Sequence, residues 1–151
     1  AVPAGKYARA ALESLGVWTG RSIAAHAVWL DDADMEILGR RGVGLAHNPE
    51  SNMKLASGIA PVDAMRKAGV AVGLGTDGAG SNDSLDLLAD LKVFALAQRH
   101  AAGDATAIGS REAWGIAAGE AAPQLGGGGP LAPGAPADFL LLRRGAHEIG
   151  R

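Results

Sequence analysis

The chain has 151 residues, no cysteine, a charged fraction of 20% and a formal net charge of -2. This length suffices for one domain with a hydrophobic core, and the charge balance gives no basic surface for nucleic acid or anionic lipid. The lack of cysteine excludes disulfides, iron–sulfur clusters and thiolate zinc sites. No apolar stretch is long enough to span a bilayer and no signal peptide opens the sequence, so we expect a cytoplasmic protein that acts on a small molecule.

Strand-like and helix-like segments alternate over the first hundred residues. Short apolar runs predict strands, and longer stretches with helical spacing predict helices. The strands are expected at 22–28, 43–46 and 70–74, and the helices at 6–15, from Asp31 or Asp32 to Arg41, at 61–68 and at 84–100. The polar segment HNPESNMKLASG, at 47–58, is predicted to be a loop. Three strand–helix units in succession imply an α/β fold with a parallel sheet.

The composition changes after one further helix, expected at 106–119 with Ser110 as its N-cap. The following segment is rich in Gly and Pro up to Ala137, which predicts a connection rather than regular structure. Residues 138–142 then predict a strand that has no obvious pairing partner in this chain. We therefore divide the chain into residues 1–118 and residues 119–151.

The stretch VAVGLGTDGAGSN, from Val70 to Asn82, carries the first candidate for chemistry. Asp77 lies just past the C-terminal end of a predicted buried strand, the position at which parallel α/β proteins bind ligands. The glycines also spell G-x-G-x-x-G, but no second strand follows at the spacing of a dinucleotide-binding unit. A role for Asp77 as a helix cap is the structural alternative.

Two histidines also fall near the ends of predicted strands. His26 lies near the end of the first strand and His47 follows the second, so both could border one cleft with Asp77. Two imidazoles and a carboxylate suit zinc or iron, but a hydrolytic metal site needs three protein ligands and a water. The chain contains no HxH and no HExxH. His100 and His147 are interpreted as solvated side chains.

Three motifs together resemble the amidohydrolase superfamily: HAVWL from His26, AHNPESNMKLASG from Ala46 and GTDGAGSN from Gly75. Within it they are most similar to the branch that holds 5′-methylthioadenosine/S-adenosylhomocysteine deaminases and triazine hydrolases. The resemblance extends to the final PLAPGAPADFLLL. It implies that residues 1–118 are strands six to eight of a metal-dependent-hydrolase (β/α)8 TIM barrel. Residues 119–151 would then be the connection and strand that return to a small β domain.

The resemblance also implies roles for individual residues. Asp77 matches the aspartate that ligates the metal and takes a proton from the attacking water. His26 matches a histidine that contacts both the attacking hydroxide and the substrate. Ser81 matches a serine beside the ring pocket, and Asn48, Glu50, Ser51 and Asn52 match the family's loop after the seventh barrel strand. Glu50, Asn52 and Ser81 are the candidate substrate contacts, with hydrogen bonding within the loop and turn as the structural alternative. The cofactor implied is one divalent metal, zinc, with ferrous iron as the alternative.

Several elements of that family have no match in this sequence. The HxH after the first barrel strand, the later histidine ligand and the glutamate that protonates the leaving nitrogen are all absent. We therefore expect a fragment that is inactive alone. Its partners would be the N-terminal half of the barrel and, in the full enzyme, further copies of the same subunit.

The function implied is hydrolytic deamination of a purine nucleoside, an adenosine derivative of the methylthioadenosine or S-adenosylhomocysteine type, with release of ammonia. Asp77 and His26 do not distinguish between ring substrates. Another amidohydrolase, such as a guanine, 8-oxoguanine or cytosine deaminase or a triazine hydrolase, therefore stays open as an alternative. A noncatalytic α/β module that binds a small ligand near Asp77 is the alternative from a different class.

Overall fold

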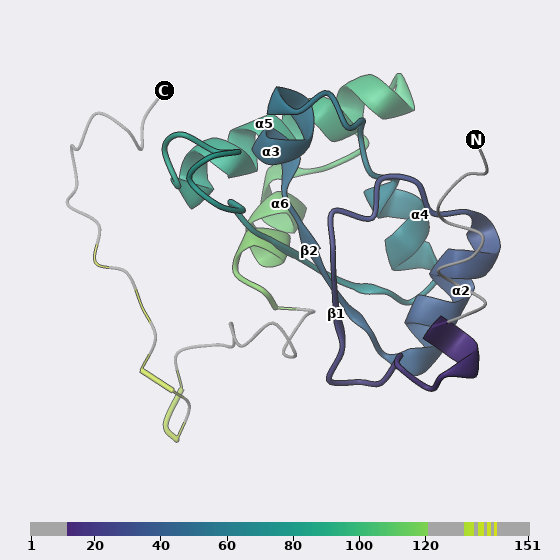
Figure 1. The fold of residues 1–151 in the computed structure, drawn as a ribbon. Coiled ribbons are helices and arrows are strands. Elements are labelled where there is room, and N and C mark those ends of the chain that lie inside the picture. The colour runs from purple at the N-terminus through teal and green to yellow at the C-terminus, as the bar shows by residue number, and fades with distance from the viewer. Residues whose placement is uncertain (1–11, 121–131, 135, 138, 140, 142–151) are drawn as a thin grey trace.

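The computed structural model describes residues 12–120, 132–134, 136, 137, 139 and 141 (Figure 1). Within them a parallel sheet of three strands alternates with helices, as the sequence predicts. The strands are β1 (Ile23–Ala25), β2 (Gly44–His47) and β3 (Ala71–Leu74), in the spatial order β1-β2-β3. The helices are α2 (Asp32–Arg41), α3 (Pro49–Lys54), α4 (Val62–Lys67), α5 (Leu87–Ala102) and α6 (Ser110–Ala117).

The strands end at one edge of the sheet. Ala25 pairs with Ala46, and Ala46 pairs with Gly73. Backbone bonds continue this pairing past the strands, from His26 N to Ala46 O at 3.0 Å and from Gly75 N to His47 O at 2.9 Å. The segments that follow all three strands therefore begin at the same edge, where ligand sites of parallel sheets lie.

Helices cover the sheet from two directions. In Figure 1, α2 and α4 lie together beside the sheet, and α3 follows the end of β2 beside α5. Alternate strand residues point to the same face, and the apolar residues at such positions pack under the helices. The buried apolar core consists of Met35, Leu38, Val43, Leu45, Ala60, Val62, Met65, Val70, Val72, Phe94, Ile108, Ala113 and Ile116. This core holds the strand ends in place.

The prediction of a loop over 47–58 is wrong for residues 49–54, and His47 is the last residue of β2. Residues Pro49–Lys54 form helix α3. Proline at the first helical position, Glu50 in the first turn and Lys54 in the last turn each suit a helix, because they match its free N–H groups and its dipole. A helix of this length is too short to show a hydrophobic period, so the sequence pattern did not reveal it.

The first strand is shorter than predicted. It ends at Ala25 rather than Val28, because His26 and Ala27 adopt left-handed backbone conformations with φ of 62° and 52°. Residues other than glycine rarely adopt this conformation, and it turns the chain out of the sheet. His26 therefore stands at the sheet edge rather than within the strand.

The predicted N-cap is correct for α2 and wrong for α6. Asp31 is the N-cap of α2, where its side chain accepts a bond from Asp34 N. The N-cap of α6 is Gly109 rather than Ser110, which is the first helical residue. The helix therefore begins four residues after the predicted start at 106 and ends at Ala117, two residues before the predicted end.

Some predictions fall largely outside the described residues. Only residues 12–15 of the first predicted helix are described; residues 12–14 are helical and Leu15 lies in the turn that follows. The final strand predicted at 138–142 lies mostly outside the described residues, and the boundary at 118/119 stays a prediction. Among the helices that the structure describes, none combines the length and apolar character needed to cross a membrane.

Candidate active site

The turn that carries Asp77 is shaped by glycine and by a left-handed residue. Gly75 follows β3 directly, and a Cβ atom there would lie 2.5 Å from Asn48 Oδ1. Any larger residue would have to displace the Asn48 side chain, so glycine suits this close approach to the segment after β2. Asp77 itself has φ of 65°, a conformation that aspartate tolerates better than most residues. The turn thereby brings the Asp77 carboxylate to the end of β2.

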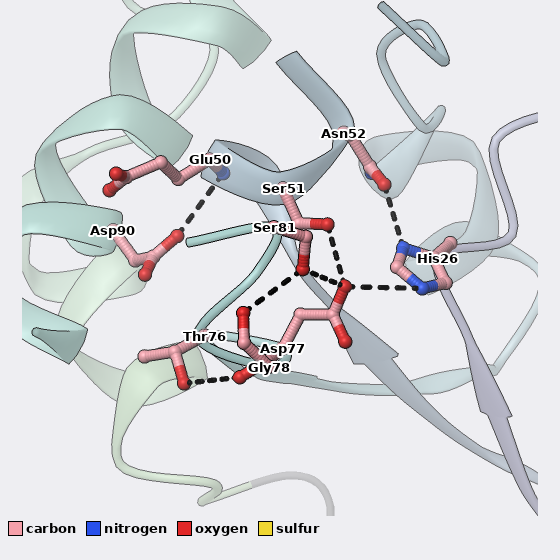
Figure 2. Close-up of polar contacts among 9 residues, drawn as sticks. All are labelled: His26, Glu50, Ser51, Asn52, Thr76, Asp77, Gly78, Ser81 and Asp90. Carbon is pink, nitrogen blue, oxygen red and sulfur yellow. Dashed lines mark hydrogen bonds and ion pairs between the residues drawn. The ribbon is translucent and has the colours of Figure 1, made fainter. Parts of the chain in front are cut away.

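Asp77 is bound by two hydroxyl groups and faces a histidine (Figure 2). Ser51 Oγ donates to Asp77 Oδ2 at 2.6 Å, and Ser81 Oγ donates to the same oxygen at 2.7 Å. His26 Nε2 lies 3.9 Å from that oxygen. Three segments that follow three different strands therefore meet at one carboxylate.

These contacts favour the ionised form of the carboxylate. The pKa of Asp77 falls to about 2, first through the hydrogen bond from Ser51, then through those from Ser81 and from the backbone of Gly78. Hydrogen bonds donated to a carboxylate stabilise its charge, whereas the slight desolvation here acts the other way. At neutral pH, Asp77 is an exposed anion that can bind a cation or accept a proton.

His26 is held on its other side by an amide. Its Nδ1 lies 2.8 Å from Asn52 Oδ1, and Asn52 is buried on α3. The ring therefore lies between Asn52 and Asp77, and Figure 2 shows its two nitrogens facing these two partners.

His47 does not join this cluster. It is almost fully buried, and its ring packs edge-on against Phe94 at a centroid distance of 5.5 Å. Burial, with a smaller electrostatic contribution from the neighbouring His26, lowers the pKa of His47 to about 4. Neither ring nitrogen has a hydrogen-bond partner among the described residues. His47 thus lies behind the sheet edge as a neutral core residue.

Glu50 and its neighbours form a second, buried cluster. The backbone N–H of Glu50 donates to Asp90 Oδ1 at 3.1 Å, and Asn82 Nδ2 donates to Asp90 Oδ2 at 2.6 Å. Asp90 and Asn82 are fully buried. In Figure 2 the Glu50 carboxylate extends away from Asp77 and His26. Asp90 therefore ties the start of α3 to the turn that carries Ser81.

Two residues of this arrangement had no assigned role from the sequence. Ser51 was matched to a motif loop, but nothing in that pattern indicates that its hydroxyl reaches Asp77. Asp90 is the one acid in the mostly apolar stretch LLADLKVF, whose other charged residue is Lys92, and an acid in such a stretch was the available signal. Buried acids are rare unless they are paired, so such a position predicts a specific partner.

The described residues do not by themselves form a complete metal site. They contain no group of three or more His, Asp or Glu side chains placed to hold one ion. A hydrolytic zinc site uses three protein ligands. Asp77 fits the requirement for one of them, since it is ionised and exposed.

Comparison with known families identifies one that covers most of the chain. A model of the amidohydrolase family matches residues 7–146. The chain therefore belongs to the amidohydrolase family, and the resemblance noted in the sequence is confirmed.

Among curated relatives, the chain is 47% identical over 135 residues to a 5′-deoxyadenosine deaminase of Methanoregula boonei. It is 49% identical over 133 residues to a 5-methylthioadenosine/S-adenosylhomocysteine deaminase of Pelotomaculum thermopropionicum. These matches cover 88% and 87% of this chain but 30% and 31% of the relatives. The chain thus spans about a third of the length of these relatives.

Solved structures show the same local fold. A zinc-bound adenosine deaminase from Xanthomonas campestris matches with a TM-score of 0.72 and 38% identity, over 78% of this chain and 27% of that one. A zinc complex of atrazine chlorohydrolase from Arthrobacter aurescens TC1 matches with a TM-score of 0.70 and 34% identity, over 76% and 26%. Within the residues described here, the three-stranded sheet does not close into a barrel.

Proposed function

We propose that this chain is the C-terminal part of a metal-dependent aminohydrolase that deaminates an adenosine derivative of the methylthioadenosine or S-adenosylhomocysteine type. The convergence of Ser51, Ser81 and His26 on Asp77 carries the proposal, because it builds an ionised acid beside an imidazole at the ligand edge of a parallel sheet. The substrate class rests on the names of relatives that are 43–54% identical to this chain.

Asp77 and His26 are the proposed catalytic pair. The Asp77 carboxylate would hold the metal and accept the proton that the attacking water loses. His26 Nε2, 3.9 Å from Asp77 Oδ2, would hydrogen-bond the attacking oxygen and the reacting carbon's substituent. The divalent metal, zinc by preference, would supply Lewis-acid activation of that water. Proton transfer by positioned side chains contributes about 10²- to 10⁴-fold to such reactions.

Substrate contacts are proposed for the residues around this pair. The Ser81 hydroxyl and His26 border Asp77 directly and would face the ring. The Glu50 carboxylate points away from Asp77 and His26. It could therefore contact only a part of the substrate that lies away from the reacting carbon. Asn52 contacts the ring of His26 through its Oδ1.

The remaining ligands would come from a part of the enzyme outside this chain. One carboxylate supplies one of the three ligands that a hydrolytic zinc site needs. The matched relatives are about three times as long as the segment that they share with this chain. We propose that the rest of the barrel pairs with the outer edges of β1 and β3 and supplies the histidine ligands.

The second candidate function is triazine hydrolysis. It is favoured by the match to the atrazine chlorohydrolase, whose TM-score of 0.70 is close to the 0.72 of the adenosine deaminase. Displacement of chloride and of ammonia from a ring carbon would use the same water activation, so the Asp77–His26 pair serves either reaction.

The upstream coding sequence and an assay of the full enzyme test the proposal. We expect an HxH motif upstream, and loss of adenosine absorbance with matching ammonia release from methylthioadenosine or S-adenosylhomocysteine.

Asp77→Asn should lower kcat by at least about 10²-fold with an unchanged fold, because asparagine also tolerates the left-handed backbone. Asp83→Asn, on the same turn, is the matched control. Absence of an HxH motif upstream would refute the proposal that the chain is part of an enzyme. Faster turnover of guanine, cytosine or a chlorotriazine would refute the proposed substrate class.

A further inference from the structure

We propose that Asn52 is a positioning residue that holds the His26 ring in the tautomer protonated at Nδ1, with Nε2 turned toward Asp77. This inference rests on the proposed function, which assigns His26 to the reacting centre. Asn52 would then act by orienting His26, and not by contacting the substrate.

The contact between the two side chains defines the tautomer. Asn52 Oδ1 lies 2.8 Å from His26 Nδ1. An amide oxygen only accepts hydrogen bonds, so the proton of this bond belongs to Nδ1. In a neutral imidazole the other nitrogen is then an acceptor. Nε2, 3.9 Å from Asp77 Oδ2, thus presents a lone pair toward the site of chemistry.

The burial of Asn52 separates positioning from substrate binding. Asn52 is only 2% exposed, whereas the His26 side chain is 39% exposed. A ligand that enters from solvent therefore reaches His26 and not Asn52. Figure 2 shows Asn52 on α3 on the far side of the ring from Asp77.

The backbone conformation of His26 does not by itself fix the orientation of its ring. His26 lies at the end of β1 with φ of 62°, and Ala27 after it has φ of 52°. These values fix where the side chain leaves the chain but not how the ring is rotated or which nitrogen is protonated. The bond to α3 fixes both, and α3 is itself tied to the turn of Asp77 through Ser51.

Nitrogen NMR of protein labelled with 15N-histidine reads the tautomer without any assay of activity. At about pH 9, where an ordinary imidazole is neutral, we expect the His26 signals of a ring protonated at Nδ1. Asn52→Asp keeps an acceptor and should keep this pattern, whereas Asn52→Leu removes it and should shift the ring toward protonation at Nε2. His100, exposed on α5, serves as an internal reference.

Each outcome of this experiment supports or overturns the proposed role of Asn52. Protonation of His26 at Nε2 in the unaltered protein overturns the proposal, as does an unchanged pattern in Asn52→Leu. If Asn52→Leu does not fold, Asn52→Asp still decides, because loss of the Nδ1 pattern there also overturns it. These readouts stand even if the enzyme acts on a different substrate.

Kinetics of the full enzyme give a second readout. Loss of a side chain that orients a reacting group costs about 10- to 100-fold in activity. We expect that loss in kcat for Asn52→Leu with little change in KM, and partial recovery in Asn52→Asp. Met53→Leu alters the exposed neighbouring residue of α3 and should match the unaltered enzyme. A rise in KM alone would identify Asn52 as a substrate contact instead.

Discussion

The Ser51 hydroxyl donates a 2.6 Å hydrogen bond to Asp77 Oδ2 although 26 residues separate the two in the chain. Ser51 belongs to α3, after β2, and Asp77 to the turn after β3, so this bond joins two neighbouring strand ends. Ser81 donates to the same oxygen from within the Asp77 turn. The carboxylate is therefore oriented by the protein itself, before any ligand binds.

Replacement of either serine should weaken the acidity of Asp77. Ser51→Ala removes the largest contribution that lowers the pKa of Asp77, so that pKa should rise from about 2 toward the ordinary value of aspartate. Ser81→Ala should act in the same direction by a smaller amount. A pH titration of the Asp77 carboxyl carbon by NMR measures both shifts.

The matched control is Ser57→Ala. Ser57 lies just after α3, and no hydrogen bond joins its side chain to Asp77. Its replacement should leave the Asp77 titration where it is. An unshifted titration in Ser51→Ala as well would mean that the bond between Ser51 and Asp77 does not form in solution.

Asp90 should be a strong determinant of stability. It is fully buried and accepts bonds from Glu50 N and Asn82 Nδ2. Asp90→Ala leaves both donors without an acceptor in the interior, and each such group costs about 1–3 kcal/mol. We therefore expect the free energy of unfolding in urea to fall by about 2–4 kcal/mol.

The control for Asp90 is Asp83→Ala. Asp83 is exposed and, within the described part of the chain, forms an ion pair with Lys54 alone. Such pairs contribute about 0–1 kcal/mol, so this variant should unfold close to the unaltered chain. Equal losses in the two variants would refute a structural role for the buried cluster around Asp90.

The sequence predicted the strand–helix alternation because apolar runs and caps are local signals. Asp31 at the start of α2 and the apolar run that becomes β3 show this directly. Helix α3 was missed because its six residues are too few to show a hydrophobic period, and because the bond from Glu50 N to Asp90 at its start joins residues 40 apart in the chain. The early end of β1 was missed because left-handed residues other than glycine leave no pattern in the sequence.

The candidate site was predictable in its strand-end positions and not in its contacts. Strand ends of a parallel sheet meet at one edge, so His26 and Asp77 were expected to be neighbours. His26 Nε2 lies 3.9 Å from Asp77 Oδ2. His47 follows the same rule along the chain, yet its side chain packs against Phe94. Which way a residue at a strand end points depends on packing that the sequence alone does not specify.

Burial of His47 should make the fold sensitive to acid. Its pKa is about 4 in the folded chain, below the ordinary 6.5. The unfolded chain therefore binds this proton more readily, and stability falls as the pH drops from about 6.5 to about 4, by up to about 3 kcal/mol. His47→Leu should remove this part of the pH dependence in urea unfolding.

His100→Leu provides the comparison for His47, because His100 is exposed on α5. The pH dependence of its unfolding should match that of the unaltered chain. If His47→Leu retained the full loss of stability between about pH 6.5 and 4, other groups would have to account for the acid sensitivity.

The isolated chain should be marginally stable or self-associating. In the described sheet, β1 and β3 each pair with β2 alone, so the outer edge of each is unpaired. Ile23 in β1 and Trp29 just after it are 52% and 80% exposed. Unpaired strand edges beside exposed apolar side chains promote association. Sedimentation velocity should show oligomers that Trp29→Ser reduces, whereas a monomer with one sharp, cooperative melting transition would contradict this expectation.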